Sequence, residues 1–287
     1  MTLLDELKAA REKGVAIGHF NFSDLSVLYG VATAARAQNV PVIVGVSEDE
    51  RAYTGVYEAA ALVKAIAARY NQRLYINADH THIFEDAIAA AKAGFDSVVY
   101  DRSDLPLQKN IEETSRAVRE LKAINPDIYV EGEIGNIGSG SEVHETVPEN
   151  LDLSTVEEAL EFVRATGVDG LAPAVGNMHG ILHSMAEGKE RKHLNLQRIA
   201  EIAKAVQMPM TLHGGSDTDE NDLRAAIKEG ITIVHISTEI RLIWRKALEA
   251  QMSVYKNEIA PHKLFKPVQD AITAAVESKL RIFTFSK

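Results

Sequence analysis

Short apolar segments alternate with longer amphipathic segments about eight times along this chain of 287 residues. The apolar segments are Val15–Phe20, Pro41–Ser47, Leu74–His80, Ser97–Asp101, Ile128–Ile134, Gly170–Gly176, Pro209–Gly214 and Thr232–Ser237. Short runs of this kind, bounded by turn residues and rich in Val and Ile, predict buried β-strands.

The segments between these strands carry apolar residues at helical spacing. They are Ser26–Gln38, Tyr57–Tyr70, Ile83–Ala93, Ile111–Ile124, Thr155–Thr166, Leu196–Val206 and Asn221–Glu229. Several are followed by glycine, as at Gly94, Gly167 and Gly230, where a left-handed C-cap favours that residue. Alternating strands and helices predict parallel strands with right-handed crossovers. Eight such units in about 240 residues predict a (β/α)8 TIM barrel of the α/β class.

The remaining segments, a C-terminal tail and two long loops, are expected to be additions to a single barrel. No low-complexity linker divides it, so we expect a single TIM-barrel domain over residues 1–287. The tail after Trp244 predicts one or two extra C-terminal helices packed outside the barrel or on a partner. The segments Gly135–Asp152 and His179–Leu194 exceed ordinary loop length and predict functional loops. A doubly wound open sheet is the alternative, but its usual glycine-rich phosphate loop does not follow Val15–Phe20.

Composition narrows the classes of function. The net charge of −10 argues against binding nucleic acid or acidic membranes over the surface as a whole. Cysteine is absent, which excludes disulfides, thiolate nucleophiles and Cys-ligated zinc. The charged N-terminus is unlike a signal peptide, and no apolar run reaches the roughly 18 residues needed to span a membrane. We therefore expect a cytoplasmic protein.

Ionisable side chains gather at the C-terminal ends of the predicted strands, which form the catalytic face of a parallel barrel. They are His19, Glu48, Asp79, His80, Asp101, Glu131, Glu133, His179, His213 and His235. Buried charges in such a cluster would repel one another without a cation between them. Three neutral imidazoles with an open position describe a catalytic Zn²⁺ site.

Two glycine-rich turns follow histidines in this set, at His179-Gly180 and at His213-Gly214-Gly215-Ser216. Glycine lets backbone N–H groups approach an anion, and a helix N-terminus favours phosphate. Ser237 and Thr238 add hydroxyl groups after the last strand, where many barrels bind phosphate. No lysine lies within a predicted strand, which argues against a Schiff-base mechanism.

Together these motifs resemble the class II, zinc-dependent ketose-bisphosphate aldolases, the group of fructose-bisphosphate and tagatose-bisphosphate aldolases. The matching pieces are His19–Asn21, Val46–Glu48 with Arg51, Tyr53 and Gly55, Ala78–His80, Tyr100–Ser103, Val130–Gly135, Gly176–Gly180, Leu212–Asp217 and Ser237–Glu239. The resemblance implies reversible retro-aldol cleavage of a ketose 1,6-bisphosphate to dihydroxyacetone phosphate and an aldehyde phosphate such as glyceraldehyde 3-phosphate. Fructose 1,6-bisphosphate is the expected substrate, with tagatose 1,6-bisphosphate or another phosphorylated ketose as the alternative.

The resemblance also implies roles for individual residues. Asp79 would act as acid and base on the C4 hydroxyl, and Glu142, with Glu145 as the alternative, would move the proton of dihydroxyacetone phosphate. The implied metal ligands are His80, His179 and His213 for the catalytic Zn²⁺, with Asp101 and Glu133 for a displaced or second metal position. The implied substrate and phosphate contacts are Asn21, Ser47, Gly180, Gly214, Ser216, His235, Ser237 and Thr238.

Two further expectations follow from the resemblance. A monovalent cation, Na⁺ or K⁺, would bind through backbone carbonyls near the phosphate, and the protein would form a homodimer or homotetramer. This chain departs from the family pattern at His235, where asparagine is usual, and at Arg102 and Asp104 in the segment Asp101–Asp104, where Asp-Gly-Ser-His is usual. Histidine titrates near neutrality, so His235 predicts a pH-dependent affinity for the phosphate end of the substrate.

Two other classes of function compete with the aldolase. A metal hydrolase of the amidohydrolase type would use the His-x-His of His80 and His82, although that motif belongs on the first strand of such barrels. A non-catalytic barrel subunit would make His235 a sign of lost chemistry, against which the intact set of metal candidates argues. A metal assay combined with a cleavage assay separates the three.

Overall fold

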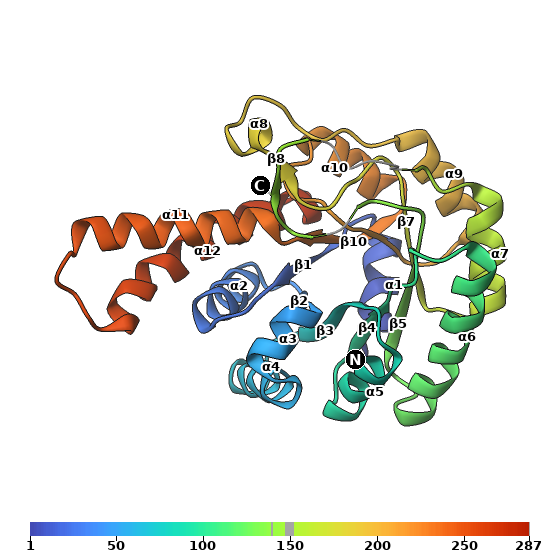
Figure 1. Ribbon diagram of the computed structural model, residues 1–287, viewed down its shortest axis with the longest axis horizontal. Helices are drawn as coiled ribbons and strands as arrows, with labels where there is room; N and C mark the ends of the chain where they lie inside the picture. Colours follow the sequence, from blue (N-terminus) through green and yellow to red (C-terminus); the bar gives the residue numbers. More distant parts are fainter. Residues whose placement is uncertain (139, 147–151, 287) are drawn as a thin grey trace.

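Eight parallel strands close into a barrel in the computed structural model, which describes residues 1–138, 140–146 and 152–286 (Figure 1). The barrel strands are β1 (Ile17–Asn21), β2 (Val42–Val46), β3 (Leu74–Thr81), β4 (Ser97–Tyr100), β5 (Tyr129–Ile134), β7 (Gly170–Pro173), β9 (Met210–Leu212) and β10 (Ile231–Ile236). They pair in chain order, and β10 closes on β1. The closed order confirms the predicted barrel and excludes the open sheet.

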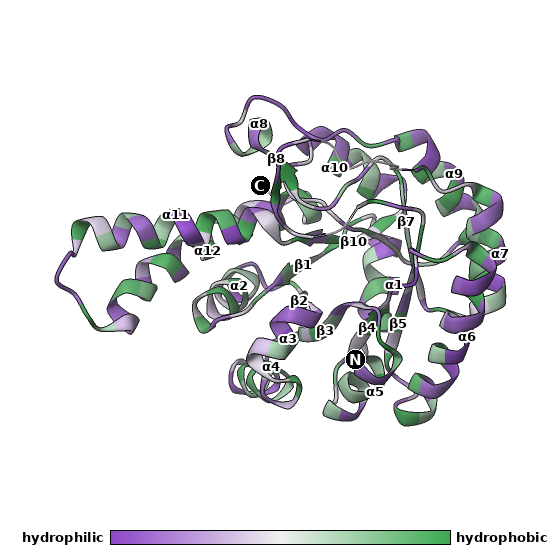
Figure 2. Ribbon diagram, in the orientation of Figure 1, coloured by the Kyte–Doolittle hydropathy of each residue, from purple (hydrophilic) through white to green (hydrophobic). Residues whose placement is uncertain are grey.

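Helices surround this barrel (Figure 1). They are α1 (Leu3–Lys13), α2 (Leu25–Gln38), α3 (Glu48–Thr54), α4 (Val56–Tyr70), α5 (Phe84–Ala93), α6 (Leu107–Ile124), α7 (Val156–Thr166), α8 (His183–Ala186), α9 (Leu196–Val206), α10 (Glu220–Lys228), α11 (Thr238–Val254) and α12 (Pro261–Thr284). Gly94 and Gly167 cap α5 and α7 with φ of 88° and 72°, as the sequence predicted. Green and purple residues alternate along these helices, as expected where one face packs on the barrel and the other meets water (Figure 2).

Alternate residues of each strand face opposite sides, which divides the core into two layers. Val42, Val44 and Val46 of β2 belong to the large cluster shared with the surrounding helices. Ile43 of the same strand instead joins a smaller cluster at the N-terminal end of the barrel, where Leu7 of α1 packs. Helix α1 therefore closes the end of the barrel opposite to the strand ends that carry ionisable groups.

The extra C-terminal helices form a hairpin that extends from the barrel (Figure 1). Helix α11 begins at Thr238, directly after β10, so the expectation that the tail begins after Trp244 placed its start several residues late. The sequence pattern places Ser237 and Thr238 at the end of the last strand as phosphate contacts, whereas Ser237 is the N-cap of α11. Helix α12 returns along α11 and packs on α2. No helix among the described residues is both long and apolar enough to pass through a membrane.

The two long loops of the barrel mouth pair with each other. Residues Val143–His144 (β6) and Ile181–Leu182 (β8) form a separate two-stranded sheet. The backbone N–H of Ile181 also donates to the Glu142 carbonyl at 2.9 Å. Residues 139 and 147–151 of the predicted functional loop lie outside the described residues.

Candidate metal and phosphate site

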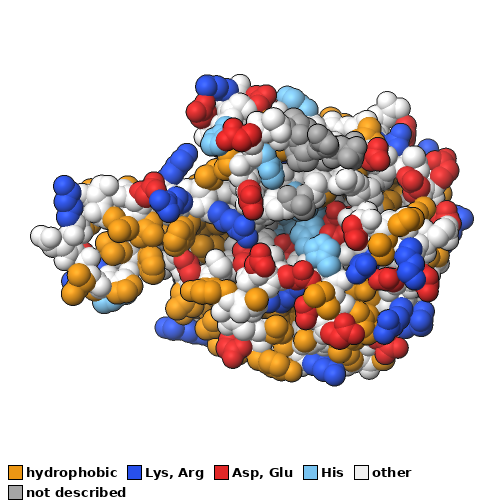
Figure 3. Space-filling view, viewed as in Figure 1, with side chains coloured by type: hydrophobic (Ala, Val, Ile, Leu, Met, Phe, Trp, Pro, Cys, Tyr) orange, Lys and Arg blue, Asp and Glu red, His pale blue; other side chains and the backbone are white. Residues whose placement is uncertain are grey.

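Three histidines converge at the C-terminal mouth of the barrel. His80 lies in β3, His179 follows β7 and His213 follows β9. One ring nitrogen from each lies within 4.8 Å of the others, close enough for all three to reach one metal ion after a small adjustment of the side chains. Pale-blue histidine side chains are visible at the centre of this face, with red carboxylates beside them (Figure 3).

The backbone at His80 explains how two neighbouring residues reach the same mouth. Successive side chains of a regular strand point to opposite faces, so Asp79 and His80 could not both face inward in one. His80 has a left-handed φ of 40°, and the register with β4 shifts between Ala78 and Thr81. The buried guanidinium of Arg51 holds this irregular segment by donating to the Asp79 carbonyl at 3.2 Å and to Thr81 Oγ1 at 3.0 Å.

Carboxylates surround His80. Its Nδ1 lies 2.9 Å from Asp101 Oδ2 and 3.6 Å from Glu133 Oε2, and its Nε2 lies 3.9 Å from Asp79 Oδ1. Burial alone would lower the pKa of His80, but Asp79, Asp101 and Glu133 raise it to about 10. Burial and the nearby Asp101 carboxylate raise the pKa of Glu133 well above its usual value. The raised pKa values mean that protons on His80 and Glu133 offset the negative charge of the cluster. A bound cation would offset the same charge.

His213 is oriented as a metal ligand would be. Its Nε2 lies 2.8 Å from Glu131 Oε1, and Thr211 donates a hydrogen bond to the other oxygen of the same carboxylate. Its Nδ1 is buried and has no hydrogen-bond partner. Burial, together with the neighbouring His80, lowers the pKa of His213 to about 3, so the ring is neutral. A neutral imidazole with one nitrogen held by a carboxylate and the other unpartnered fits a metal centre.

Asp79 lies beside the three histidines and is charged. Its Oδ2 accepts a hydrogen bond from Asn21 Nδ2 at 2.8 Å, and its Oδ1 lies 3.3 Å from His235 Nδ1. Burial opposes ionisation, but His80 and the hydrogen bond with His235 hold the pKa of Asp79 well below its usual range. A buried carboxylate in this position is suited to take a proton from a bound ligand.

His235 faces Asp79 and not the glycine turns. Its ring stacks on His19 with centroids 3.5 Å apart, and His19 Nε2 lies 3.1 Å from Asn77 Oδ1. Burial and the neighbouring His213 lower the pKa of His235 to about 4. The expected titration near neutrality is therefore not supported, because the residue is neutral and contacts the carboxylate instead of the anion site.

All of the predicted substrate and phosphate contacts except Ser47 line one small cavity together with the three histidines. Its walls are Asn21, Asp79, His80, Ser141, His179, Gly180, His213, Gly214, Ser216, His235, Ser237 and Thr238. Gly214 has a φ of 60°, and a Cβ there would lie 2.2 Å from the Met178 carbonyl oxygen, so only glycine fits. Ser216 Oγ accepts hydrogen bonds from the backbone N–H groups of Ser237 and Glu239. The Ser237 hydroxyl is buried and has no partner, as expected of a group that meets a ligand.

Three predicted site residues lie apart from this cavity or at its rim. Ser47 is the N-cap of α3: its side chain accepts a hydrogen bond from the Glu50 backbone N–H, and its own backbone N–H donates to the Glu50 carboxylate. These contacts stabilise the start of the helix. Glu142 is exposed beside β6. Glu145 is also exposed and forms an ion pair with His183 at 3.3 Å. Neither glutamate is brought against Asp79 in this arrangement.

The His-x-His expected of an amidohydrolase does not form a metal site here. The His82 ring is half exposed and contacts Glu48 at 3.2 Å and Asp101 at 3.4 Å. Among the donors in the described ranges, no group of three includes His82.

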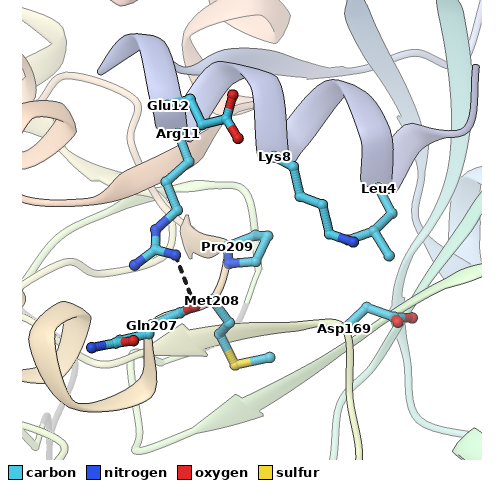
Figure 4. A pocket seen from close by; sticks show the side chains of 8 residues that line it. All are labelled: Leu4, Lys8, Arg11, Glu12, Asp169, Gln207, Met208 and Pro209. Atoms are coloured by element: carbon cyan, nitrogen blue, oxygen red, sulfur yellow. Dashed lines mark hydrogen bonds between the residues drawn. The ribbon is translucent and has the colours of Figure 1, made fainter.

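A larger cavity, of about 560 Å³, lies at the opposite end of the barrel. It lies between α1 and the segments that lead into β7 and β9, and Arg11 donates to the Gln207 carbonyl across it at 2.8 Å (Figure 4). Its walls include no histidine. We therefore place the chemistry at the smaller cavity, where the perturbed ionisable groups gather.

Two residues that shape the site, Glu131 and Lys192, have roles that the sequence alone does not indicate. Glu131 was noted at a strand end, but its hydrogen bond to His213 depends on the register of β5 and β9. Nothing in the sequence distinguishes Lys192 from Lys189 in the same loop. Its buried ammonium lies behind the glycine turns.

Comparisons with known proteins agree on one family. The sequence profile described as "Fructose-bisphosphate aldolase class-II" matches residues 1–287. The chain is 32% identical over 286 residues to a "Probable fructose-bisphosphate aldolase" of Bacillus subtilis, covering 99% of this chain and 97% of the relative. It is 31% identical to the fructose-bisphosphate aldolase of Staphylococcus epidermidis, covering 99% and 96% of the two chains.

A solved structure extends this agreement to the fold. The YdjI aldolase from Escherichia coli K12 is 26% identical and superposes with a TM-score of 0.82, covering 98% of this chain and 96% of that chain. Members of the matching family are aldolases, which are carbon–carbon lyases. The chain belongs to the class II fructose-bisphosphate aldolase family.

Proposed function

We propose that this protein reversibly cleaves a ketose 1,6-bisphosphate, with fructose 1,6-bisphosphate as the first substrate to test. The products would be dihydroxyacetone phosphate and glyceraldehyde 3-phosphate. One observation carries the proposal: three histidine donors within 4.8 Å of one another stand beside the charged Asp79 carboxylate at the barrel mouth. The names of the Bacillus and Staphylococcus relatives favour fructose 1,6-bisphosphate over its tagatose isomer.

His80, His179 and His213 would hold Zn²⁺, and the unpartnered Nδ1 of His213 supports this assignment. The bound ion would supply Lewis-acid polarisation of the substrate ketone. Asp101 and Glu133 form a second donor group with His80, which supports a displaced or second metal position. Asn21, which donates to Asp79, would orient that carboxylate.

Two separate groups would divide the proton transfers. Asp79 would take the proton of the C4 hydroxyl during cleavage and return it during condensation, because its charge is held by His80 and His235. Glu142 or Glu145 would exchange the proton at the carbon of dihydroxyacetone phosphate. Both belong to the exposed loop around β6, so either would have to move inward when substrate binds.

The phosphate of the ketone would rest on the glycine turns. Gly180 and Gly214 offer backbone groups, and Ser216 offers a hydroxyl after β9. Ser237 and Thr238 offer hydroxyl or backbone groups at the start of α11. His235, which lines the cavity beside Asp79, would contact the substrate there, and no role in binding is proposed for Ser47, which caps α3. A monovalent cation is also implied by the family, but the carbonyls that converge here accept hydrogen bonds from Lys192, so an ion would have to displace that side chain.

A chelation experiment tests the proposal. Cleavage of fructose 1,6-bisphosphate and of tagatose 1,6-bisphosphate would be measured for untreated, chelated and zinc-restored protein. We expect activity on the fructose isomer to vanish on chelation and to return with zinc. Full activity after exhaustive chelation would overturn the metal assignment, and no cleavage of either sugar by zinc-loaded protein would overturn the function.

A further inference from the structure

The ammonium group of Lys192 lies in a cage of backbone carbonyls behind the phosphate cradle. Its Nζ donates to the carbonyl oxygens of Met178 at 2.9 Å, Gly180 at 2.6 Å and Gly214 at 2.8 Å. The residue is 3% exposed, which is unusual for a lysine. All three N–H bonds of the ammonium are therefore used inside the protein.

The cage joins the two turns that carry metal candidates. Met178 and Gly180 flank His179, and Gly214 follows His213. The backbone of Lys192 is itself fixed, because its N–H donates to Asp217 and its carbonyl accepts from Asp219. The lysine thus ties three backbone segments of the mouth together at one point.

This arrangement has the chemistry of a cation site. Converging carbonyl oxygens are the ligands that proteins offer to monovalent and other hard cations. None of the described carboxylates forms an ion pair with Lys192 Nζ, so its charge is not neutralised by direct contact. The groups closest to that charge on the cavity side are Gly180 and Gly214, where we place the phosphate.

A nucleophilic role for Lys192 fits the structure less well. Burial lowers its pKa to about 7, opposed by the carboxylates of Asp217 and Glu239, and a lowered pKa is one mark of a Schiff-base lysine. However, Lys192 is not among the residues that line the cavity, and its nitrogen faces carbonyls instead of open space. The three acceptors and a phosphate dianion nearby would favour the charged form.

We propose that the Lys192 ammonium is a built-in replacement for a monovalent cation: it holds the His179 and His213 turns together and places positive charge behind the phosphate. The proposal rests on the proposed aldolase function. In these terms Lys192 is a positioning residue that acts through the two turns. The wild-type enzyme should consequently need neither Na⁺ nor K⁺.

Cation dependence tests this directly. Cleavage would be measured in buffer whose only cation is tetramethylammonium, and again with added Na⁺, K⁺ or NH₄⁺. We expect wild-type kcat and KM to change less than about twofold, whereas Lys192→Ala, with an emptied cage, should raise KM at least about tenfold and recover with NH₄⁺ or K⁺. Lys192→Met fills the space without charge, so it should lose activity and show no recovery.

Lys189→Ala is the matched control, since Lys189 lies in the same loop and is exposed. It should behave as the wild type in every buffer. Wild-type activity that requires Na⁺ or K⁺ would overturn the proposal, even if neither Lys192 variant folds. The proposal would also be overturned if the Lys192 variants had the activity of the wild type. The same holds if Lys192→Ala were as active in tetramethylammonium alone as with added NH₄⁺ or K⁺.

Thermal unfolding separates this proposal from the aldolase function. Zinc-loaded Lys192→Ala should gain Tm on titration with NH₄⁺ or K⁺ and reach saturation, while wild type and Lys189→Ala should show no cation-specific gain. If the wild type cleaves neither sugar but this pattern holds, the function is wrong and the cation site is right. If cleavage is found but Lys192→Ala gains nothing, the cation site is wrong.

Discussion

At the scale of single residues, His80 shows how the site depends on an irregular backbone. A left-handed φ at a residue other than glycine costs on the order of 1–3 kcal/mol and persists only where its surroundings enforce it. Here Arg51 fixes the flanking carbonyl and Asp101 holds the ring. As a result Asp79 and His80, which are adjacent in sequence, both face the cavity. These contacts, and not strand propensity, hold the conformation of His80.

Asp79→Asn should separate proton transfer from metal binding. The amide keeps the size of the carboxylate and can still contact Asn21 and His235, but it cannot accept a proton. We expect kcat to fall by about 10²–10⁴-fold while zinc content stays near that of the wild type. Metal analysis and steady-state kinetics would measure both, with the exposed Asp104→Asn as the control. Loss of zinc in Asp79→Asn would mean that Asp79 is a ligand.

The raised pKa of His80 predicts that metal binding depends on pH. Its pKa of about 10 in the metal-free protein means that the ring carries a proton at pH 7.5, and a metal can bind only after that proton leaves. Zinc uptake should therefore release about one proton or more, and affinity should rise with pH through the neutral range. Calorimetry in two buffers of different ionisation enthalpy measures the release. Identical heats in both buffers would contradict it.

At the scale of elements, the sequence predicted the barrel strands because each is a short apolar run between turn residues. Their predicted bounds lie within three residues of those in the structure. The small elements β6, β8 and α8 were missed, because their pairing depends on contacts between loops about 40 residues apart and not on local periodicity. Helix α3 was also missed, although Ser47 and Glu50 form the capping box that marks its start.

The loop around β6 should close over the bound substrate. Residues 140–146 are held by a two-residue pairing with β8 and by a few contacts of exposed side chains, such as the Glu145–His183 ion pair. Glu142 is itself exposed, so the local free energy of opening should be low. Hydrogen–deuterium exchange there should be fast in zinc-loaded protein and slower when inorganic phosphate and dihydroxyacetone phosphate are added. The same protection with and without ligand would argue against a lid. The barrel strand β2, buried throughout, serves as the internal control.

The candidate site could be predicted only in part for a related reason. Residue types at strand ends identified the three histidines and the carboxylates around them, because the geometry of a parallel barrel brings strand ends together whatever the loops do. The contacts of Lys192 and the backbone reversal at His80 depend on loop paths that periodicity does not encode. His235 was placed in the right region, but its neighbours, His19 and Asp79, determine a neutral ring.

At the scale of the whole molecule, a single domain and a homo-oligomer remain our predictions. A single domain over residues 1–287 is supported by α12, which packs on α2 and so ties the C-terminal hairpin to the barrel. The hairpin nevertheless extends well beyond the strands (Figure 1). Its far end carries four exposed apolar side chains, Met252, Val254, Tyr255 and Ile259. Apolar side chains gathered in this way commonly mark an interface.

Replacing this end of the hairpin should dissociate a homodimer or homotetramer. Tyr255→Ser combined with Ile259→Ser removes two side chains that are 58% and 91% exposed, so the fold of the protomer should not depend on them. We expect sedimentation at micromolar concentration to show an oligomer for the wild type and a smaller species for the variant, with Tm lowered because assembly stabilises the folded protomer. Ile124→Ser on α6, on the far side of the barrel, is the matched control and should leave assembly unchanged. A wild-type monomer would refute the prediction, and an unchanged oligomer in the double variant would place the interface on another face.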